Sequence, residues 1–170
     1  MKRATLLATV FCAASIVATS SAQAADTPDQ AAIKKILNDG CAAFVNGDSK
    51  GAISLYLSNY PKFMVFDIAP PREKNYDQVK AFNDQMLAAT DGKPTCVYEE
   101  INPVILTPTY AYSTAILHST GKLKNGSSFD FRERATDVWK KVKGEWKVMH
   151  EHNSVPVDVM TGKADLTVAP

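Results

Sequence analysis

The chain has 170 residues, 19 basic (Lys and Arg) and 18 acidic (Asp and Glu), with a formal net charge of +1. No cluster of basic residues occurs along it. A nearly neutral chain of this kind argues against nucleic acid as a partner and against an anionic membrane surface.

The N-terminus is predicted to be a secretory signal peptide, residues 1–24. Lys2 and Arg3 precede the apolar run ATLLATVFCAASIVA, and Ala22 and Ala24 form the small-residue pattern of a cleavage site. The run is too short for a membrane span, so a retained membrane anchor is the weaker alternative. Cleavage after Ala24 leaves 146 of the 170 residues, with no membrane contact and a periplasmic or secreted location.

Two cysteines remain after cleavage, because Cys12 leaves with the signal peptide. In an oxidising compartment Cys41 and Cys96 form either a disulfide or a pair of buried free thiols. Both alternatives stay open, since a bridge requires a Cα separation that the sequence does not supply.

The first part of the mature chain is predicted to be mostly helical. Thr27 or Asp29 is a suitable cap for a helix that begins near Pro28, and apolar residues recur at helical spacing as far as Phe44. Gly47 is a suitable stop. The pattern then predicts a short helix over 49–57, a strand over 62–68, a helix over 76–90 and a loop over 91–94.

The second part is predicted to consist of long antiparallel strands. They cover about 95–106, 110–123, 129–142 and 145–157, with hairpin turns at Asn125-Gly126 and Lys143-Gly144. Helices followed by a strand meander indicate one α+β domain over 25–158, with helices against one face of a curved sheet. Residues 159–170 are small and polar, typical of a loose tail.

The order of these elements resembles the NTF2-like superfamily, and within it the SnoaL-like, ketosteroid isomerase-like group. The spacing of the last two strands is similar to the association domain of calmodulin-dependent protein kinase and its bacterial relatives. The residues that carry it are Thr136, Val138, Trp139, Gly144, Trp146, His150, His152, Ser154 and Pro156. The stretch FDIAPPREKNYDQVKAF also resembles the strand, loop and third helix of the family, so the resemblance covers about residues 29–158.

This resemblance implies an NTF2-like cone, in which a curved antiparallel sheet wraps around the N-terminal helices and leaves a pocket at the open end. Members of the group include isomerases, cyclases, dehydratases and epoxide hydrolases. Others are binding or assembly domains without chemistry. The fold therefore implies no single activity.

His150 and His152 occupy alternate positions of the last predicted strand, on the same face as Trp146. That face is predicted to line the interior of the cone. We interpret His150 as a packing residue, whereas for His152 pocket lining and a structural hydrogen bond are both open.

A metal site at these histidines lacks ligands. Zinc needs three or four, and His118, Asp67 and Asp137 do not stand at a recognised spacing from the pair. We therefore predict neither a metal nor a cofactor.

Arg134 is a candidate for binding an acidic group of a ligand, depending on the register of the last hairpin. A three-residue turn over 143–145 pairs Thr136 with His152 and Arg134 with Ser154, which directs Arg134 toward the pocket. A two-residue turn shifts the register by one residue and exchanges the faces. In the second case Arg134 is a surface charge.

Further candidates surround the predicted pocket. Asp67 follows an apolar strand and is a candidate general base, with an Asp that bonds the backbone of the following Pro-Pro turn as the alternative. Tyr60, Tyr98 and Tyr112 are candidate hydroxyl donors or core aromatics. His118 and Trp146 complete the candidate ligand-binding residues.

The favoured interpretation is a protein that binds a small, largely apolar organic molecule in the cone without turnover. The alternative is a cofactor-free isomerase, cyclase or dehydratase with Asp67 or His152 as general base. The outer face of the sheet, on which we expect Trp139, is predicted to form a homodimer.

Overall fold

The computed structural model describes residues 25–71 and 73–167, and the predicted signal peptide lies outside the described residues. The helices are α1 (Pro28–Val45), α2 (Ser49–Ala52) and α3 (Tyr76–Ala89). The strands are β1 (Met64–Phe66), β2 (Glu73–Lys74), β3 (Thr90–Thr107), β4 (Tyr110–Leu123), β5 (Ser128–Val142) and β6 (Glu145–Ser154).

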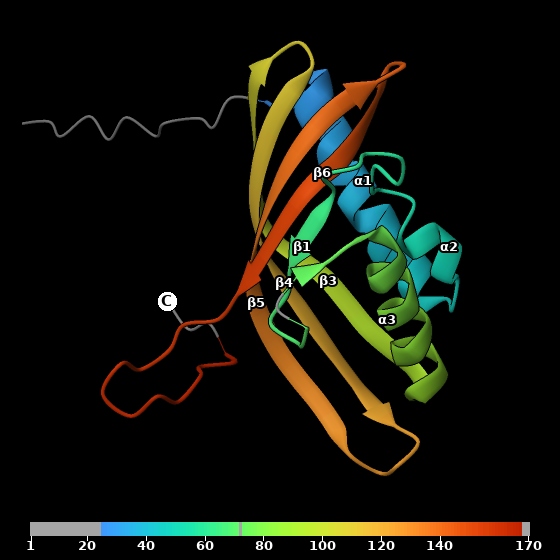
Figure 1. Ribbon diagram of the computed structural model, residues 1–170, viewed down its shortest axis with the longest axis vertical. Helices are drawn as coiled ribbons and strands as arrows, with labels where there is room; N and C mark the ends of the chain where they lie inside the picture. Colours follow the sequence, from blue (N-terminus) through green and yellow to red (C-terminus); the bar gives the residue numbers. More distant parts are fainter. Residues whose placement is uncertain (1–24, 72, 168–170) are drawn as a thin grey trace, which may run out of the picture.

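These strands form one sheet in the order β2-β1-β6-β5-β4-β3, with the helices on one side of it (Figure 1). The predicted α+β fold is confirmed. Neighbouring strands run antiparallel except β1 and β6, which are parallel, so the sheet is mixed. We call the side of the sheet that faces the helices the inner face and the other side the outer face.

Helix α1 forms where the sequence predicts it. Thr27 is the N-cap, and its side chain accepts a hydrogen bond from the backbone of Gln30, whose own side chain accepts from the backbone of Thr27. Ile33, Leu37 and Cys41 are buried at a spacing of four residues, which is one face of a helix. This face packs against the inner face of the sheet.

Helix α2 is shorter than the predicted 49–57 and ends at Ala52. The reason is tertiary, because the following backbone bonds to β6 instead of continuing the helix. Val148 donates from its backbone nitrogen to the carbonyl oxygen of Leu55 (2.9 Å), and Leu57 donates in return to Val148 (2.8 Å). The chain is thereby held beside the sheet ahead of β1.

The predicted loop over 91–94 is wrong, because this segment lies within β3. Thr90 pairs with Leu123 and Asp91 with Lys122, and regular pairing resumes at Thr95 after an irregularity. Gly and Pro in this stretch indicate a loop from sequence alone, but the adjacent strand β4 supplies enough partners to keep it in the sheet.

The last hairpin has a two-residue turn and a β-bulge. Lys143 and Gly144 both have positive φ (52° and 86°), as a tight turn of this type requires. Farther along, Trp139 pairs with Val148 but Val138 pairs with His150, so Met149 is an extra residue on β6.

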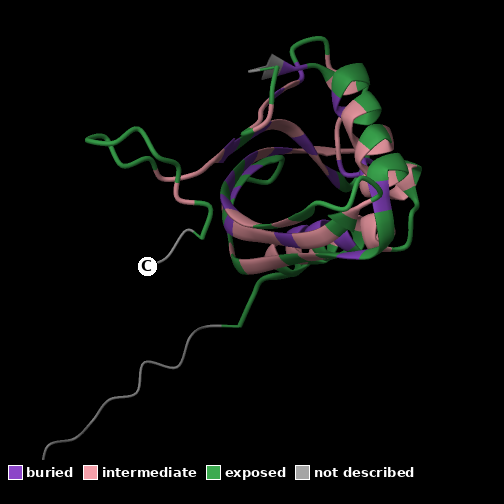
Figure 2. Cartoon of the chain, turned by 90° about the horizontal axis from the view of Figure 1, so that it is seen from below, coloured by how far each residue is buried: buried purple, intermediate pink, exposed green. Residues whose placement is uncertain are grey.

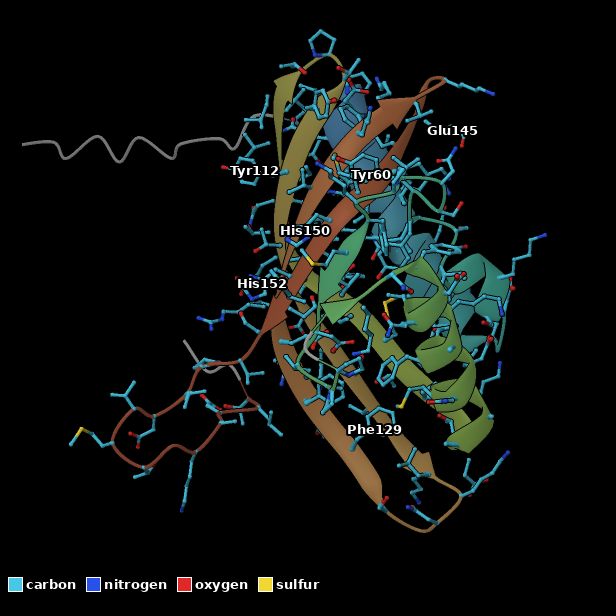
Figure 3. All side chains as sticks on the ribbon, viewed as in Figure 1. Tyr60, Tyr112, Phe129, Glu145, His150 and His152 are labelled. Carbon is cyan, nitrogen blue, oxygen red and sulfur yellow. A yellow bond between two sulfur atoms is a disulfide. The ribbon has the colours of Figure 1, made fainter. Side chains whose placement is uncertain are left out.

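This bulge reverses which residues of β6 face inward. Trp146 and Val148 are buried before it, whereas Glu151 and Asn153 are buried after it. Both histidines therefore lie on the outer face (Figure 3). The prediction that they share a face with Trp146 is wrong, because it assumed uninterrupted alternation.

The bulge also decides the position of Arg134. The pairs Thr136–His152 and Arg134–Ser154 are present, although the turn has only two residues, because Met149 restores that register. Arg134 is exposed and lies on the outer face, so its predicted direction toward the pocket is wrong. Trp139, expected on the outer face, is fully buried on the inner one.

Two apolar clusters hold the helices to the sheet, and the buried residues follow the inner side of its curve (Figure 2). The larger cluster contains Ile33, Leu37, Leu55, Ala111, Trp139, Trp146 and Val148. The smaller one contains Ile53, Phe63, Val65 and Val79. A disulfide between Cys41 and Cys96 joins α1 to β3, which decides between the two alternatives left open for these cysteines.

After β6 the chain forms a small projecting loop (Figure 1). Val157 pairs with Ala164, and Asp158 and Lys163 bond through their backbones (2.9 Å). The carbonyl oxygen of Leu166 accepts from the backbone nitrogen of Arg132 in β5 (2.7 Å). Within the described residues, no helix has the length and apolar character needed to cross a membrane.

Candidate functional site

A cavity of about 410 Å³ lies between the helices and the inner face of the sheet. Its apolar wall includes Leu37 and Phe44 of α1, Val79, Phe82 and Met86 of α3, and Leu117, Phe129 and Phe131 of the sheet. In Figure 3 Phe129 lies on the helix side of the sheet. The disulfide between Cys41 and Cys96 is part of the same wall. The volume is within the range of small-molecule sites in proteins.

Polar side chains gather where β5 and β6 meet the cavity. Glu133, Glu151 and Asn153 line it from these strands, and Tyr98 lines it from β3. All three residues of β5 and β6 are at least nine-tenths buried. The cavity therefore has a long apolar part and one acidic, hydrogen-bonding region.

Glu151 is held by two donors. The hydroxyl of Tyr56 donates to its Oε2 (2.7 Å), and Nδ2 of Asn153 donates to its Oε1 (2.6 Å). Burial raises the pKa of the Glu151 carboxyl, and these two hydrogen bonds oppose that rise. The contacts fix Glu151 in one orientation at the cavity wall.

Asp137 lies directly opposite Glu151 in the pairing of β5 with β6, and it is completely buried. Ser113 donates to its Oδ2 (2.8 Å), and the indole of Trp139 donates to Ser113 (2.9 Å). The other carboxyl oxygen, Oδ1, has no partner among the described residues. Burial, and next the nearby Glu151, raise the pKa of Asp137 well above its usual value, so this group favours the protonated form.

Glu133 is the least constrained acid of the cavity. It is 5% exposed, and no hydrogen bond from another described residue reaches its carboxyl. Burial raises the pKa of this group to about 8, with further contributions from Glu151 and Asp67 that Lys74 partly offsets. Glu133 thus has a proton to give at neutral pH and lies at the cavity surface.

Asp67 lines the cavity, but its carboxylate is already engaged. Its Oδ2 accepts from the ammonium of Lys74 (3.0 Å), and its Oδ1 accepts from the backbone of Ala69 (3.0 Å). Lys74 is 1% exposed, donates also to the carbonyl oxygen of Ala69 (2.6 Å), and lies 4.7 Å from the ring centre of Phe82. The backbone bond agrees with the turn-forming alternative for Asp67, and the lysine adds an ion pair.

Asn153 has an unused acceptor. Its Nδ2 is bound to Glu151, whereas its Oδ1 is buried without a partner among the described residues. A buried amide oxygen without a donor costs free energy, and this oxygen is covered by protein rather than exposed at the cavity surface.

The remaining predicted site residues are spread over the molecule. Tyr98 lines the cavity, whereas Tyr60 packs beside the cluster of Ile53, Phe63, Val65 and Val79. Trp146 is part of the core, and its indole donates to Asp29 (3.0 Å). Of these three residues, only Tyr98 lies in the cavity wall.

Four predicted residues lie on the outer face, namely Tyr112, His118, Arg134 and His152. Figure 3 shows Tyr112 and His152 among them. His118 bonds to Asp130 through Nε2 (2.9 Å). The rings of His150 and His152 both lie 5.6 Å from the ring of Phe66, and Nδ1 of His150 donates to the carbonyl oxygen of Met64 (2.8 Å). In the described part of the chain, no group of three or more His, Cys, Asp or Glu is placed to hold a metal ion.

Sequence reasoning missed Glu133, Glu151 and Asn153. The first could have been found, because Glu133 and Asp137 alternate with Phe131, Ala135 and Trp139 along one face of β5. Acids inside an otherwise apolar strand face indicate buried, functional or specially paired carboxyls. Glu151 and Asn153 could not have been found, because nothing in the sequence around Met149 indicates that the alternation is interrupted there.

Comparison of the fold with solved structures identifies its class as NTF2-like. An NTF2-like protein of unknown function from Pseudomonas putida KT2440 is 20% identical, with a TM-score of 0.71 over 85% of this chain and 99% of that one. A putative calcium/calmodulin dependent protein kinase II association domain from Xanthomonas campestris is 21% identical, with a TM-score of 0.61 over 75% of this chain and 87% of that one. A putative scytalone dehydratase from Novosphingobium aromaticivorans is 14% identical, with a TM-score of 0.68 over 84% and 94%.

At these identities the likeness concerns the fold alone. The family follows from the sequence, since the model of the SnoaL-like domain matches residues 33–158. The chain belongs to this family. No curated protein matches it.

Proposed function

We propose that this protein binds a small, largely apolar organic molecule in the cavity. The observation that carries the proposal is an apolar cavity of about 410 Å³ with buried polar groups at one place in its wall. The apolar wall supplies affinity through burial of the ligand. Glu133 and Tyr98 orient its polar group.

The test uses a neutral bicyclic alcohol, 2-tetralol, as the probe in isothermal titration calorimetry. Ser119→Trp fills the cavity, because Ser119 lies in its wall, and is expected to abolish binding. Thr114→Trp is the matched control, since Thr114 is exposed on the outer face of the same strand β4. The proposal is contradicted if 2-tetralol binds to the Ser119→Trp variant as it does to wild type, or if it does not bind to the wild-type protein.

A second candidate function is cofactor-free proton transfer on such a ligand. It is favoured by the Glu133 carboxyl at the cavity surface, whose pKa is raised to about 8 and which has no hydrogen-bond partner among the described residues. A group with a pKa near the working pH suits general acid and base catalysis. In this candidate Glu133 replaces His152, which faces away from the cavity, and Asp67, which is bound to Lys74.

Exchange of the α-protons of 2-tetralone with solvent deuterium, followed by NMR, tests this candidate. Wild-type protein is expected to accelerate exchange, and Glu133→Gln is expected to remove the acceleration while retaining binding of 2-tetralol. If the rate of exchange is the same with and without protein, this candidate is wrong and ligand binding remains the proposed function.

We further propose that the protein is exported and forms a homodimer. A disulfide between Cys41 and Cys96 supports an oxidising location. Exposed apolar residues on the outer face of β3 and β4 support the dimer, namely Val97, Val104, Leu106, Tyr110 and Tyr112. Native mass spectrometry of periplasmic protein tests export, because the expected mass begins at Ala25.

A further inference from the structure

The charge of the cavity wall distinguishes among the ligands that could enter it. The described wall of the cavity contains six titratable side chains, and none of them comes from α1, α3 or β4. These are Tyr56, Asp67, Lys74 (β2), Tyr98 (β3), Glu133 (β5) and Glu151 (β6), and Asp137 lies opposite Glu151 outside the wall.

The acids outnumber the cations around this region. Lys74 is the one ammonium among the described residues of the cavity wall, and it is already paired with Asp67. Burial raises the pKa of the hydroxyls of Tyr56 and Tyr98 well above the usual value, so both stay neutral. Among the described residues of the wall, no unpaired cation is therefore available to an anionic ligand.

The groups that lack partners are mainly acceptors. Glu133 lines the cavity without a hydrogen-bond partner among the described residues, whereas the unpartnered Oδ1 of Asn153 is itself buried. Glu133 lies on the same inner face, two residues along β5 from Ala135, the residue that pairs with Asn153. The hydroxyls of Tyr98 and Ser119 in the wall can donate or accept.

We infer that the ligand carries a basic nitrogen, and that its ammonium group binds the carboxylate of Glu133, with the hydroxyl of Tyr98 in the same wall as a second acceptor. This inference rests on the proposed binding function and names the chemical class of the ligand. An ammonium supplies several donors and neutralises the carboxyl of Glu133, which has no hydrogen-bond partner among the described residues. Phe82, Phe129 and Phe131 in the wall suit an aromatic or alicyclic body attached to the nitrogen.

Binding of such a ligand releases a proton. Below about pH 8, free protein carries a protonated Glu133, and the free amine is an ammonium ion. The complex holds carboxylate and ammonium together, so one proton passes to the buffer for each ligand bound. Affinity for the amine therefore rises with pH, by about tenfold per unit, until Glu133 is ionised in the free protein.

The experiment compares 2-aminotetralin with its neutral isostere 2-tetralol by calorimetry at about pH 6 and pH 7.5. The amine is expected to bind at least about tenfold more tightly at the higher pH, and the alcohol to change by less than about twofold. Titrations in phosphate and Bis-Tris buffers, which differ in ionisation enthalpy, are expected to show nearly one proton released with the amine at the lower pH and none with the alcohol.

Two variants test whether Glu133 is responsible for the pH-dependent binding of the amine. Glu133→Gln is expected to lower the affinity for the amine by about tenfold or more and remove its pH dependence, while the alcohol still binds. Glu145→Gln, a substitution of an exposed acid at the start of β6, is expected to behave as wild type. The inference is overturned if 2-tetralol binds as tightly as 2-aminotetralin, or more tightly, at the higher pH, or if binding of the amine releases no proton. Either result leaves the proposed function in place. If neither probe binds, both fail.

Discussion

Asp137 and Glu151 occupy opposed positions on β5 and β6, and both carboxyls are buried on the inner face of the sheet. Glu151 has donors from Tyr56 and Asn153, whereas Asp137 has one from Ser113. Two ionised carboxylates buried beside each other and away from water are unfavourable, so the pair retains a proton. We assign that proton to Asp137, because it has fewer donors.

Asp137→Asn is therefore expected to cost little, about 1 kcal/mol or less of the free energy of unfolding at neutral pH, because the amide resembles a neutral carboxyl in shape and charge. Asp137→Ala is expected to cost about 2–4 kcal/mol, since it leaves a hole and removes the acceptor of Ser113. Urea unfolding of both variants measures the difference. An asparagine variant as unstable as the alanine variant contradicts a protonated Asp137.

Stability is expected to fall as pH rises from about 4.5 toward about 8. The pKa of Glu133 is about 8 in the folded protein against an ordinary value of 4.5, so between these values the folded state binds more protons than the unfolded state. The slope for Glu133 approaches about 1.4 kcal/mol per pH unit, and Asp137 and Glu151 act in the same direction.

Urea unfolding across this pH range tests the effect of Glu133. Glu133→Gln is expected to flatten the decline and to be more stable than wild type at about pH 7.5. Glu145→Gln is the control, because that acid is exposed and its replacement is expected to leave the slope unchanged. If Glu133→Gln leaves the slope as steep as in wild type, Glu133 is ionised throughout.

The disulfide between Cys41 and Cys96 is expected to contribute strongly to stability. It spans 55 residues of sequence, and restriction of an unfolded loop of that length corresponds to about 4 kcal/mol. The double variant Cys41→Ser/Cys96→Ser is expected to lose about 2–4 kcal/mol in urea unfolding. Added reductant should destabilise wild type but not the double variant, and an equal response of the two would contradict the assignment.

The proposed dimer is expected to depend on the outer face of β3 and β4. Leu106 is 61% exposed and Tyr112 is 38% exposed there, so Leu106→Asp/Tyr112→Asp places charge in the proposed interface. Sedimentation velocity is expected to show a dimer for wild type and a monomer for this variant. Val159→Asp, at an 89% exposed position of the projecting loop, is the control and should remain dimeric. A wild-type monomer, or a dimer of the double variant, rules out this interface.

The two faces of β6 predict different effects on binding. His152 lies on the outer face, so His152→Ala is expected to change the affinity for 2-tetralol by less than about twofold. Asn153→Ala removes the donor that holds Glu151 at the cavity wall and is expected to weaken binding by about fivefold. Calorimetry of the two variants measures this, and the reverse order of effects would place the ligand on the outer face.

The sequence by itself determined the fold and most elements. Periodicity and capping residues specify α1 and α3 with almost the observed bounds, and strand β4 is predicted at the observed residues. These signals are local, because helix caps, alternation and turn residues act over a few neighbouring positions. The family resemblance likewise rests on spacing within the last two strands, and the family is confirmed.

Tertiary structure decided which residues form the site. One extra residue, Met149, exchanges the faces of β6, which moves His152 outward and brings Glu151 and Asn153 to the cavity. No local pattern marks this bulge, since it depends on how β5 and β6 pair over their whole length. The pKa of Glu133 likewise depends on groups from other strands, which only the folded chain brings together.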